Sequence, residues 1–401
     1  MTTLRRITVC AVIAMLLLFV FVGCNSEKTP VATDEIETEA PAGTDTTIET
    51  DEPKTDNNET NAPETDAPVA ETEGPEIDPV TGEPVRYSYL TGYPISAEQQ
   101  QKRPVAIMIN NIWIAIPQIG ISHGEVYYEC AAEGGITRIM MLVSDYENIG
   151  TIGSVRSSRD YFVDFLDNHD ALYVHAGGSD QAYAKLSWRK IENLDAVTMY
   201  LPDTFWRDQN RLANMGYEHS LMTSGSAIAS GIAYKGYRTE LNADYKPVLN
   251  FCNPKDEINL GTEEAKHIHI NTTAVQTVDY VFSEETGEYL RYQYNGDAHI
   301  DGANGEQISV KNVIILFTDI ALIPGDTAGR LTVETVGEGR GYYMTNGEVK
   351  EIVWSRSHNR APISMKYADG SELVMNCGKT FINVVDYSVE KTLAFNYSWA
   401  D

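Results

Sequence analysis

Val105-Ala-Ile-Met-Ile109 and Ala171-Leu-Tyr-Val-His175 are short, mostly apolar runs, and they indicate the class of fold. Runs of this length that are apolar at nearly every position are typical of strands buried on both faces of a sheet. Ile136-Thr-Arg-Ile-Met-Met-Leu-Val143 is a third, less regular candidate. Helical patterns fall between and after these runs, so strands alternate with helices from Arg103 to about Gly236.

Three helices are predicted in this region, because apolar residues recur there at intervals of three and four. Two of them open with Ser179 or Thr223, residue types that cap helix N-termini. The predicted helices cover 158–168, 179–188 and 223–234.

The chain becomes rich in predicted strands after a polar segment, Cys252 to Lys266, which contains Pro and Gly and is the best internal boundary. Asn346-Gly347 and Asp369-Gly370 are strong hairpin markers, and Thr286-Gly287 is a further turn signal. The predicted strands cover 267–272, 278–282, 289–294, 313–317, 331–336, 349–354, 363–367 and 381–385.

These patterns predict an α+β protein with two lobes. An N-terminal lobe, 86–250, is expected to hold a mixed sheet with helices, and a C-terminal lobe, 266–401, is expected to be mainly antiparallel and β-rich.

The N-terminus has the features of an export signal. Arg5 and Arg6 precede an apolar run, 7–22, which is shorter than the roughly 20 residues that span a membrane. Phe21-Val22-Gly23-Cys24 resembles a bacterial lipobox. We therefore expect a lipoprotein signal peptide, 1–23, and a lipid on Cys24 that anchors the protein at the extracytoplasmic face of the cell membrane.

Residues 24–85 are predicted to be a disordered acidic tether. Residues 25–85 contain no Phe, Trp, Tyr, Leu or Met, so they cannot bury enough apolar surface to offset the entropy of ordering. Much of the formal charge of −28 resides here, since 27–85 holds 18 acidic side chains against two lysines.

The remainder, 86–401, is still acidic, with 40 acidic and 26 basic side chains and no cluster of Lys and Arg. A protein that follows nucleic-acid phosphates needs a cationic face, so a nucleic-acid partner is not expected. Cys130, Cys252 and Cys377 have no close spacing, which favours free thiols over a disulfide framework or a CxxC metal site. A Cys130–Cys377 or Cys252–Cys377 bridge stays open as an alternative.

Unusual polar residues are concentrated between Asn110 and His219. Their order resembles the DUF3048 (YerB-like) family, and the resemblance covers nearly all of 86–386. It implies a lipid-anchored or secreted envelope protein of two lobes, and it implies no activity. The residues that carry it are Asn110-Asn111, Glu129, Glu133–Arg138, Gly153–Asp160, His175–Ser179, Phe205–Asp208 with Arg211, Glu218-His219-Ser220, Gly337–Gly341, Trp354–Arg356 and Asn376–Thr380.

Arg156 and Arg159 precede a predicted helix, where guanidinium groups and free helix N–H groups together favour an anion. Local ion pairs at an exposed helix start would explain them equally well. Ser179 follows two glycines between a strand and a helix, so a ligand can approach the backbone there, although a structural turn is the simpler interpretation.

Glu129 and Glu133 share a face of either a helix or a strand, and paired carboxylates can hydrolyse glycosides. Pairing with a nearby arginine such as Arg138 is the commoner arrangement. His267 and His269 alternate on a predicted strand, yet spacing supplies no third ligand, so neither a metal nor a cofactor is expected.

The leading hypothesis is a lipid-anchored envelope protein that binds a cell-wall glycan or anionic envelope polymer in an arginine-rich cleft. An envelope glycan or phosphodiester hydrolase and a scaffold for another envelope protein are the alternatives. Residues that flank predicted strands and helices are expected to meet at one edge of the sheet. The candidate catalytic residues are Glu129, Glu133, His175 and His219, and the candidate binding residues are Asn110, Arg138, Arg156, Arg159, Ser179, Arg207, Asp208 and Arg211.

Overall fold

The computed structural model describes residues 76–77, 82, 84–294 and 296–399. The predicted signal peptide, Cys24 and most of the predicted tether lie outside these residues. In the described part of the chain, no helix is both long and apolar enough to cross a membrane.

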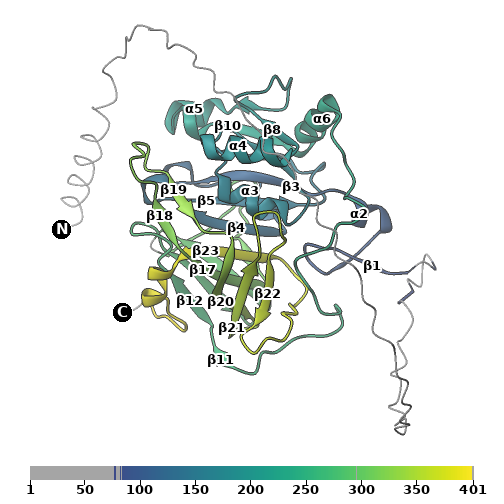
Figure 1. Ribbon diagram of the computed structural model, residues 1–401, viewed down its shortest axis with the longest axis vertical. Coiled ribbons are helices and arrows are strands. Elements are labelled where there is room, and N and C mark those ends of the chain that lie inside the picture. The colour runs from purple at the N-terminus through teal and green to yellow at the C-terminus, as the bar shows by residue number, and fades with distance from the viewer. Residues whose placement is uncertain (1–75, 78–81, 83, 295, 400–401) are drawn as a thin grey trace, which may run out of the picture. The chain divides into compact units, whose positions relative to one another are not determined.

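A mixed sheet of 11 strands forms the centre of the described chain (Figure 1). Its strands come from both predicted lobes. In spatial order they are β11 (Glu263–Glu264), β21 (Glu348–Arg356), β20 (Gly337–Thr345), β17 (Asn312–Thr318), β23 (Thr380–Asp386), β4 (Val126–Ala131), β5 (Thr137–Val143), β3 (Val105–Asn111), β7 (Leu172–His175) and β8 (Asn193–Asp195), with β22 (Ser364–Tyr367) paired to β21.

The two halves of the chain join at β23, which is yellow in Figure 1 and lies between β17 and β4. β23 is parallel to both neighbours, and Phe381 pairs with Val313 on one side and with Tyr127 on the other. All seven residues of β17 are buried, as are the first six of β23. Strands that precede the predicted boundary at 252–266 and strands that follow it therefore belong to the same sheet.

Each face of this sheet is covered by different elements. On one face, Phe162 and Leu166 of α3 (Asp160–Asp167) pack with Met140 of β5 in one buried cluster. On the other face, Ile228 of α6 (Gly225–Lys235) and Ile268 of β12 (His267–Ile270) belong to a second buried cluster.

Four smaller sheets complete the β-structure of the part of the chain that the structure describes. The largest covers the second face of the main sheet and is entirely antiparallel. It contains β12, β13 (Val278–Ser283), β14 (Glu288–Gln293), β15 (Asp297–Ala298) and β16 (Ser309–Val310). A three-stranded sheet contains β6 (Thr151–Gly153), β10 (Leu221–Ser224) and β9 (Trp206–Arg207). Two two-stranded sheets pair β18 (Ile320–Leu322) with β19 (Leu331–Val333) and β1 (Arg86–Tyr87) with β2 (Pro94–Ile95).

The three predicted helices are present as α3, α4 (Asp180–Arg189) and α6. Ser179 caps α4 as predicted, since its side chain accepts a hydrogen bond from the Ala182 N–H. The predicted cap Thr223 is wrong by one residue: Thr223 belongs to β10 and donates its hydroxyl to the Thr204 carbonyl, and Ser224 caps α6. The other helices among the described residues are α2 (Ala97–Gln101) and α5 (Gln209–Asn214), with short 3-10 turns at Trp113–Ala115, Ile121–His123, Glu133–Gly135, Tyr217–His219 and Tyr387–Thr392.

The α+β class with mixed and antiparallel sheets is confirmed. One long strand, β20, was not predicted, because three glycines in 337–341 read as a loop. These glycines permit close packing instead: a Cβ on Gly341 would lie 2.1 Å from the Ile315 carbonyl oxygen, and one on Gly339 would lie 2.4 Å from the Trp354 indole nitrogen. The turn Asn346-Gly347 joins β20 to β21 as predicted.

Candidate functional site

A cleft of about 480 Å³ lies where the parallel strands β3 and β7 end and where α3 and α4 begin. It is the edge at which layered sheets commonly place ligands. Its wall combines small and apolar residues with five arginines. The charged lining residues are Arg138, Arg156, Arg159, Arg207, Arg330, Glu133 and Glu218.

The inner part of this arginine cleft is organised around Glu133. Arg159 binds the Glu133 carboxylate through both Nε and Nη2, the latter at 2.8 Å, and Arg138 donates its Nη2 to the same carboxylate at 3.1 Å. A further Arg138 nitrogen, Nη1, donates to the Ser157 carbonyl at 2.8 Å. One carboxylate therefore holds two guanidinium groups in fixed orientations.

The outer part carries three more arginines. Arg156 donates to the carbonyl and to the carboxylate of Glu218, each at 3.1 Å. The Arg207 guanidinium lies 3.6 Å from the centre of the Tyr217 ring, and no carboxylate of the described residues lies within ion-pair distance of it. Arg330 enters from the hairpin of β18 and β19, where it pairs with Asp326 at 3.2 Å.

The cleft has an excess of positive charge in an otherwise acidic chain. Five guanidinium groups face two carboxylates in its lining. The Nε atoms of Arg138 and Arg156 are also buried, and no acceptor in the described part of the chain reaches either of them. A buried donor without a partner is costly, and the Nε atoms of Arg189, Arg291 and Arg356, which lie outside the cleft, share this feature.

The protonation of the cleft favours fixed charges over proton transfer. Burial raises the pKa of Glu133, but the hydrogen bond from Arg159 and the charge of Arg138 outweigh burial, so its pKa lies below the ordinary value. Burial and the neighbouring Arg159 lower the pKa of Arg138 to about 10. Both groups are therefore ionised at neutral pH.

The N-terminus of α4 forms another part of the wall, through Gly178 and Ser179. The turn before it is held by Asp195, whose carboxylate accepts the Gly177 N–H at 2.7 Å and the Tyr183 hydroxyl at 2.8 Å. The positive end of the helix dipole adds to the field of the arginines.

His175 and His219 lie beside the cleft and do not line it. His175 is fully buried, with Nδ1 at 2.9 Å from the Gly177 carbonyl oxygen and Nε2 at 3.2 Å from the Asn193 side-chain oxygen. His219 Nδ1 accepts a hydrogen bond from the Asn110 amide at 2.9 Å. Burial and the charge of Arg156 lower the pKa of His219.

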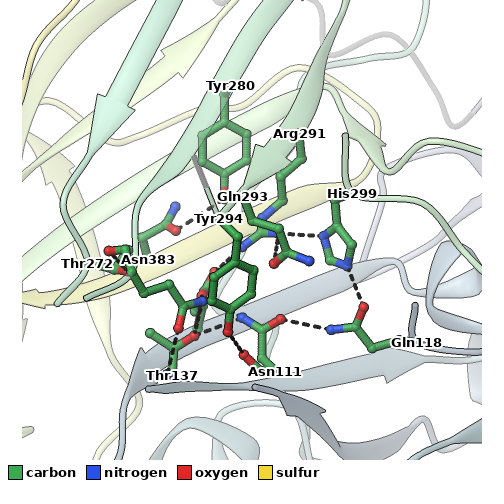
Figure 2. A network of polar contacts seen from close by, with 12 residues as sticks. Asn111, Gln118, Thr137, Thr272, Tyr280, Arg291, Gln293, Tyr294, His299 and Asn383 are labelled. Atoms are coloured by element: carbon green, nitrogen blue, oxygen red, sulfur yellow. Dashed lines mark hydrogen bonds and ion pairs between the residues drawn. The ribbon is translucent and has the colours of Figure 1, made fainter. Parts of the chain in front are cut away.

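Glu129 lies apart from the cleft, in a buried polar network between β4 and the five-stranded sheet. Figure 2 shows other members of this network, among them Asn111, Arg291 and His299. Its carboxylate accepts Arg291 Nη2 at 2.6 Å, the Asn111 amide at 3.0 Å and the Thr137 hydroxyl at 2.5 Å. Glu129 and Glu133 therefore do not form a carboxylate pair, because Glu133 pairs with Arg138 and Arg159 in the cleft.

The network closes on itself. Arg291 donates to His299 Nδ1, so His299 Nε2 carries the proton and donates to the Gln118 oxygen at 3.0 Å. Gln118 donates to the Asn111 oxygen at 2.8 Å, and the Asn111 amide reaches Glu129, which binds Arg291. Figure 2 shows this ring linking residues of the main sheet to residues of the five-stranded sheet. Its contacts are those of a structural core.

Two further predicted residues lie outside the cleft and have structural partners. Asp208 caps α5 by accepting the Arg211 N–H at 2.7 Å. The Arg211 side chain donates to the carbonyls of Ala115 and Pro117, which fixes the segment after β3.

His267 and His269 both contact Asp279 Oδ1, at 3.0 and 2.7 Å. Across 84–294 and 296–399 no group of three or more His, Cys, Asp or Glu side chains is arranged to hold a metal ion.

Three charged or aromatic residues of the cleft were not predicted as binding residues: Tyr217, Glu218 and Arg330. Glu218 and Tyr217 adjoin His219, so the local motif pointed near them. Arg330 had no such signal, because only the fold of the β18–β19 hairpin brings it to the cleft.

The sequence matches the models of both domains of one protein family. Residues 90–238 match the DUF3048 N-terminal domain, and residues 268–382 match the DUF3048 C-terminal domain, each described as a protein of unknown function. The chain belongs to the DUF3048 family. The family inferred from the motifs is thus confirmed.

One DUF3048 relative is the "Putative lipoprotein YerB" of Bacillus subtilis (strain 168), which is 27% identical over 300 residues, or 74% of this chain and 85% of the relative. The crystal structure of the Bacillus subtilis YerB protein is similar to this one, with a TM-score of 0.65 and 27% identity over 75% of this chain and 96% of the solved chain. The α+β fold is therefore shared with the Bacillus subtilis YerB protein.

Proposed function

We propose that this DUF3048 protein is a lipid-anchored protein of the extracytoplasmic face of the membrane, and that its arginine cleft binds an anionic group of a cell-wall glycan or envelope polymer. One observation carries the binding role: five arginines and two carboxylates line one cleft, which leaves an excess of positive charge in it. Guanidinium forks of this kind suit carboxylate and phosphate oxygens.

The anchoring role is supported by sequence and by a relative. Arg5, Arg6, the apolar run 7–22 and Gly23-Cys24 have the order of a lipoprotein signal, and the Bacillus subtilis relative carries the name lipoprotein. The acidic segment that follows Cys24, 25–85, would hold the cleft away from an anionic membrane surface.

Binding is favoured over hydrolysis by the state of the carboxylates. Glu133 has a lowered pKa and is held by Arg159 and Arg138, so it is a poor general acid. Glu129 is bound by Arg291 and is 1% exposed, so a substrate cannot reach it. Neither residue has the freedom that a glycoside hydrolase needs from its acid and base.

The binding role is tested by equilibrium titration of the mature protein with two purified probes, a phosphate-containing wall polymer and a carboxylate-containing glycan. We expect Arg156→Ala and Arg207→Ala each to weaken binding of the preferred probe about tenfold or more, because each removes charge-assisted hydrogen bonds. Added salt should also weaken binding.

The matched control is Arg340→Ala, which removes an arginine that is 61% exposed and pairs with Glu390 outside the cleft. Equal affinities for the wild type, both cleft variants and this control would contradict the proposal. Release of fragments from either probe by the wild type, abolished by Glu133→Gln, would favour the hydrolase instead.

The anchor is tested separately. Cys24→Ala, expressed with the complete leader, should move the protein from the membrane fraction to the soluble fraction, because the lipid supplies most of the membrane affinity. Membrane retention equal to that of the wild type would contradict a lipid on Cys24.

A further inference from the structure

Two cysteines lie next to each other although 125 residues separate them in the sequence. Phe251 pairs in a parallel bridge with Met375, and the Cys252 N–H donates to the Met375 carbonyl at 2.8 Å. Cys377 follows two residues later, and its Sγ lies 3.2 Å from the Cys252 carbonyl oxygen. The Cys252 thiol itself donates to the Asp256 carbonyl at 3.3 Å.

The two thiols differ in their access to solvent. Cys252 is half-buried, whereas Cys377 is buried beneath Gly92, whose carbonyl oxygen lies 3.4 Å from the Cys377 Sγ. Burial and the neighbouring Cys252 raise the pKa of Cys377 to about 11. A reagent from solvent therefore reaches Cys252 first, and Cys377 can react with what forms on Cys252.

We propose that Cys252 and Cys377 form a redox pair that closes to a disulfide when the protein meets a disulfide donor. This inference is independent of the proposed ligand of the arginine cleft. The pair joins the segment after α6 to the segment before β23, and it does so beside the turn between β1 and β2.

The reaction consists of two exchanges. The Cys252 thiol loses its proton, and its thiolate attacks one sulfur of the donor disulfide, which releases the other donor sulfur as a thiolate. The Cys377 thiol then loses its proton and attacks the Cys252 Sγ, which releases the second donor thiolate. Two protein thiols are oxidised to one disulfide, and the donor disulfide is reduced to two thiols.

The chain offers an internal control, since Cys130 is also free but lies in β4 with 1% exposure. Cys130 has neither access to a reagent nor a neighbouring cysteine in the described residues. It should remain a thiol under conditions that oxidise the pair.

The experiment is to incubate the folded mature protein with oxidised glutathione, quench with acid, alkylate in denaturant, and map the unreduced peptides by mass spectrometry. We expect a peptide containing Cys252 linked to a peptide containing Cys377. The alkylatable cysteines among Cys130, Cys252 and Cys377 should fall from three to one. Cys252→Ser should abolish the link and leave Cys377 alkylatable.

Two results would overturn the proposal. In one, Cys252 and Cys377 remain as alkylatable after oxidised glutathione as before. In the other, glutathione accumulates on Cys252 and is never displaced by Cys377, which would show that the two sulfurs cannot meet in the folded protein. Because the wild type is compared with itself, neither result depends on the folding of a variant.

Discussion

At the scale of single residues, the most consequential contact is the ion pair of Glu129 and Arg291, which are 1% and 0% exposed. Desolvation of both charges opposes folding, and the pair is tolerable only because other polar groups complete its hydrogen bonds. Asn111, Thr137 and His299 supply those bonds. A ring of this kind fixes how the five-stranded sheet sits on the main sheet.

We predict that Glu129→Gln lowers the free energy of unfolding by about 3–5 kcal/mol, because it leaves the Arg291 charge buried without a counter-charge. Urea denaturation measures this loss. The control is Glu284→Gln, which breaks the exposed pair with Lys266 and should leave the free energy of unfolding nearly unchanged.

The double variant Glu129→Gln with Arg291→Met should recover part of the lost stability, because it removes both charges. A Glu129→Gln protein as stable as the control would show that the ion pair contributes little to the fold.

Buried histidines make stability depend on pH. Burial and the charge of Arg291 hold the pKa of His299 well below its ordinary value of 6.5, so the folded protein binds fewer protons there than the unfolded chain. The contribution of neutral His299 to the free energy of unfolding is fully present above about pH 6.5. It is lost as the pH falls below that value, by up to about 1.4 kcal/mol per pH unit.

Unfolding free energies of the wild type and His299→Gln, measured at pH 7.5, 6.5 and 5.5, test this prediction. The variant should lose less stability between pH 6.5 and 5.5, because glutamine does not titrate yet can both accept from Arg291 and donate to Gln118. Parallel curves for the two proteins would contradict it. His169, whose pKa burial lowers to about 3, contributes equally to both curves and cancels.

At the scale of elements, α4 and α6 provide a matched comparison, since each is capped by a serine that accepts an N–H three residues on. We predict that Ser179→Ala and Ser224→Ala each lower stability by about 1 kcal/mol. Only Ser179 lines the cleft, so only Ser179→Ala should also weaken binding of the polymer probe. If both variants changed binding equally, the N-terminus of α4 would not be part of the binding site.

Elements with strong local signals could be predicted from the sequence. β3, β7 and β23 each contain a short, mostly apolar run, and α3 and α4 have clear helical spacing. β20 could not be predicted, because its glycines serve contacts with β17 and β21 that only the sheet creates. The order of the strands could not be predicted either, since no local signal places β23 beside β4.

The candidate site could likewise be predicted only where local sequence signals mark its residues. Glu133, Arg138, Arg156 and Arg159 flank strands or helices in one region of the chain, and the structure brings them into one cleft. Arg330 arrives from a distant hairpin. Arg291, which is 162 residues from Glu129, explains why a carboxylate that resembled a catalytic group in the sequence has a structural contact instead.

At the scale of the whole molecule, the shared sheet predicts cooperative unfolding. β23 pairs along its length with β17 and β4, so neither half of the chain can complete the sheet alone. We predict that 86–401 unfolds in a single calorimetric transition. The fragments 86–250 and 266–401, expressed separately, should each lack a sharp transition. Two resolved transitions, or a folded fragment, would instead support two independent lobes.

The position of β23 also has a consequence for biogenesis. A chain that emerges N-terminus first presents β3, β4, β5 and β7 long before residues 380–386 are available to cover the open side of β4. Contacts between such distant segments form late and slowly. If the chain is exported as proposed, an unfinished sheet would leave it unfolded enough to be threaded through a membrane pore, so the strand order that unites the two halves would also delay folding until nearly the entire polypeptide has crossed.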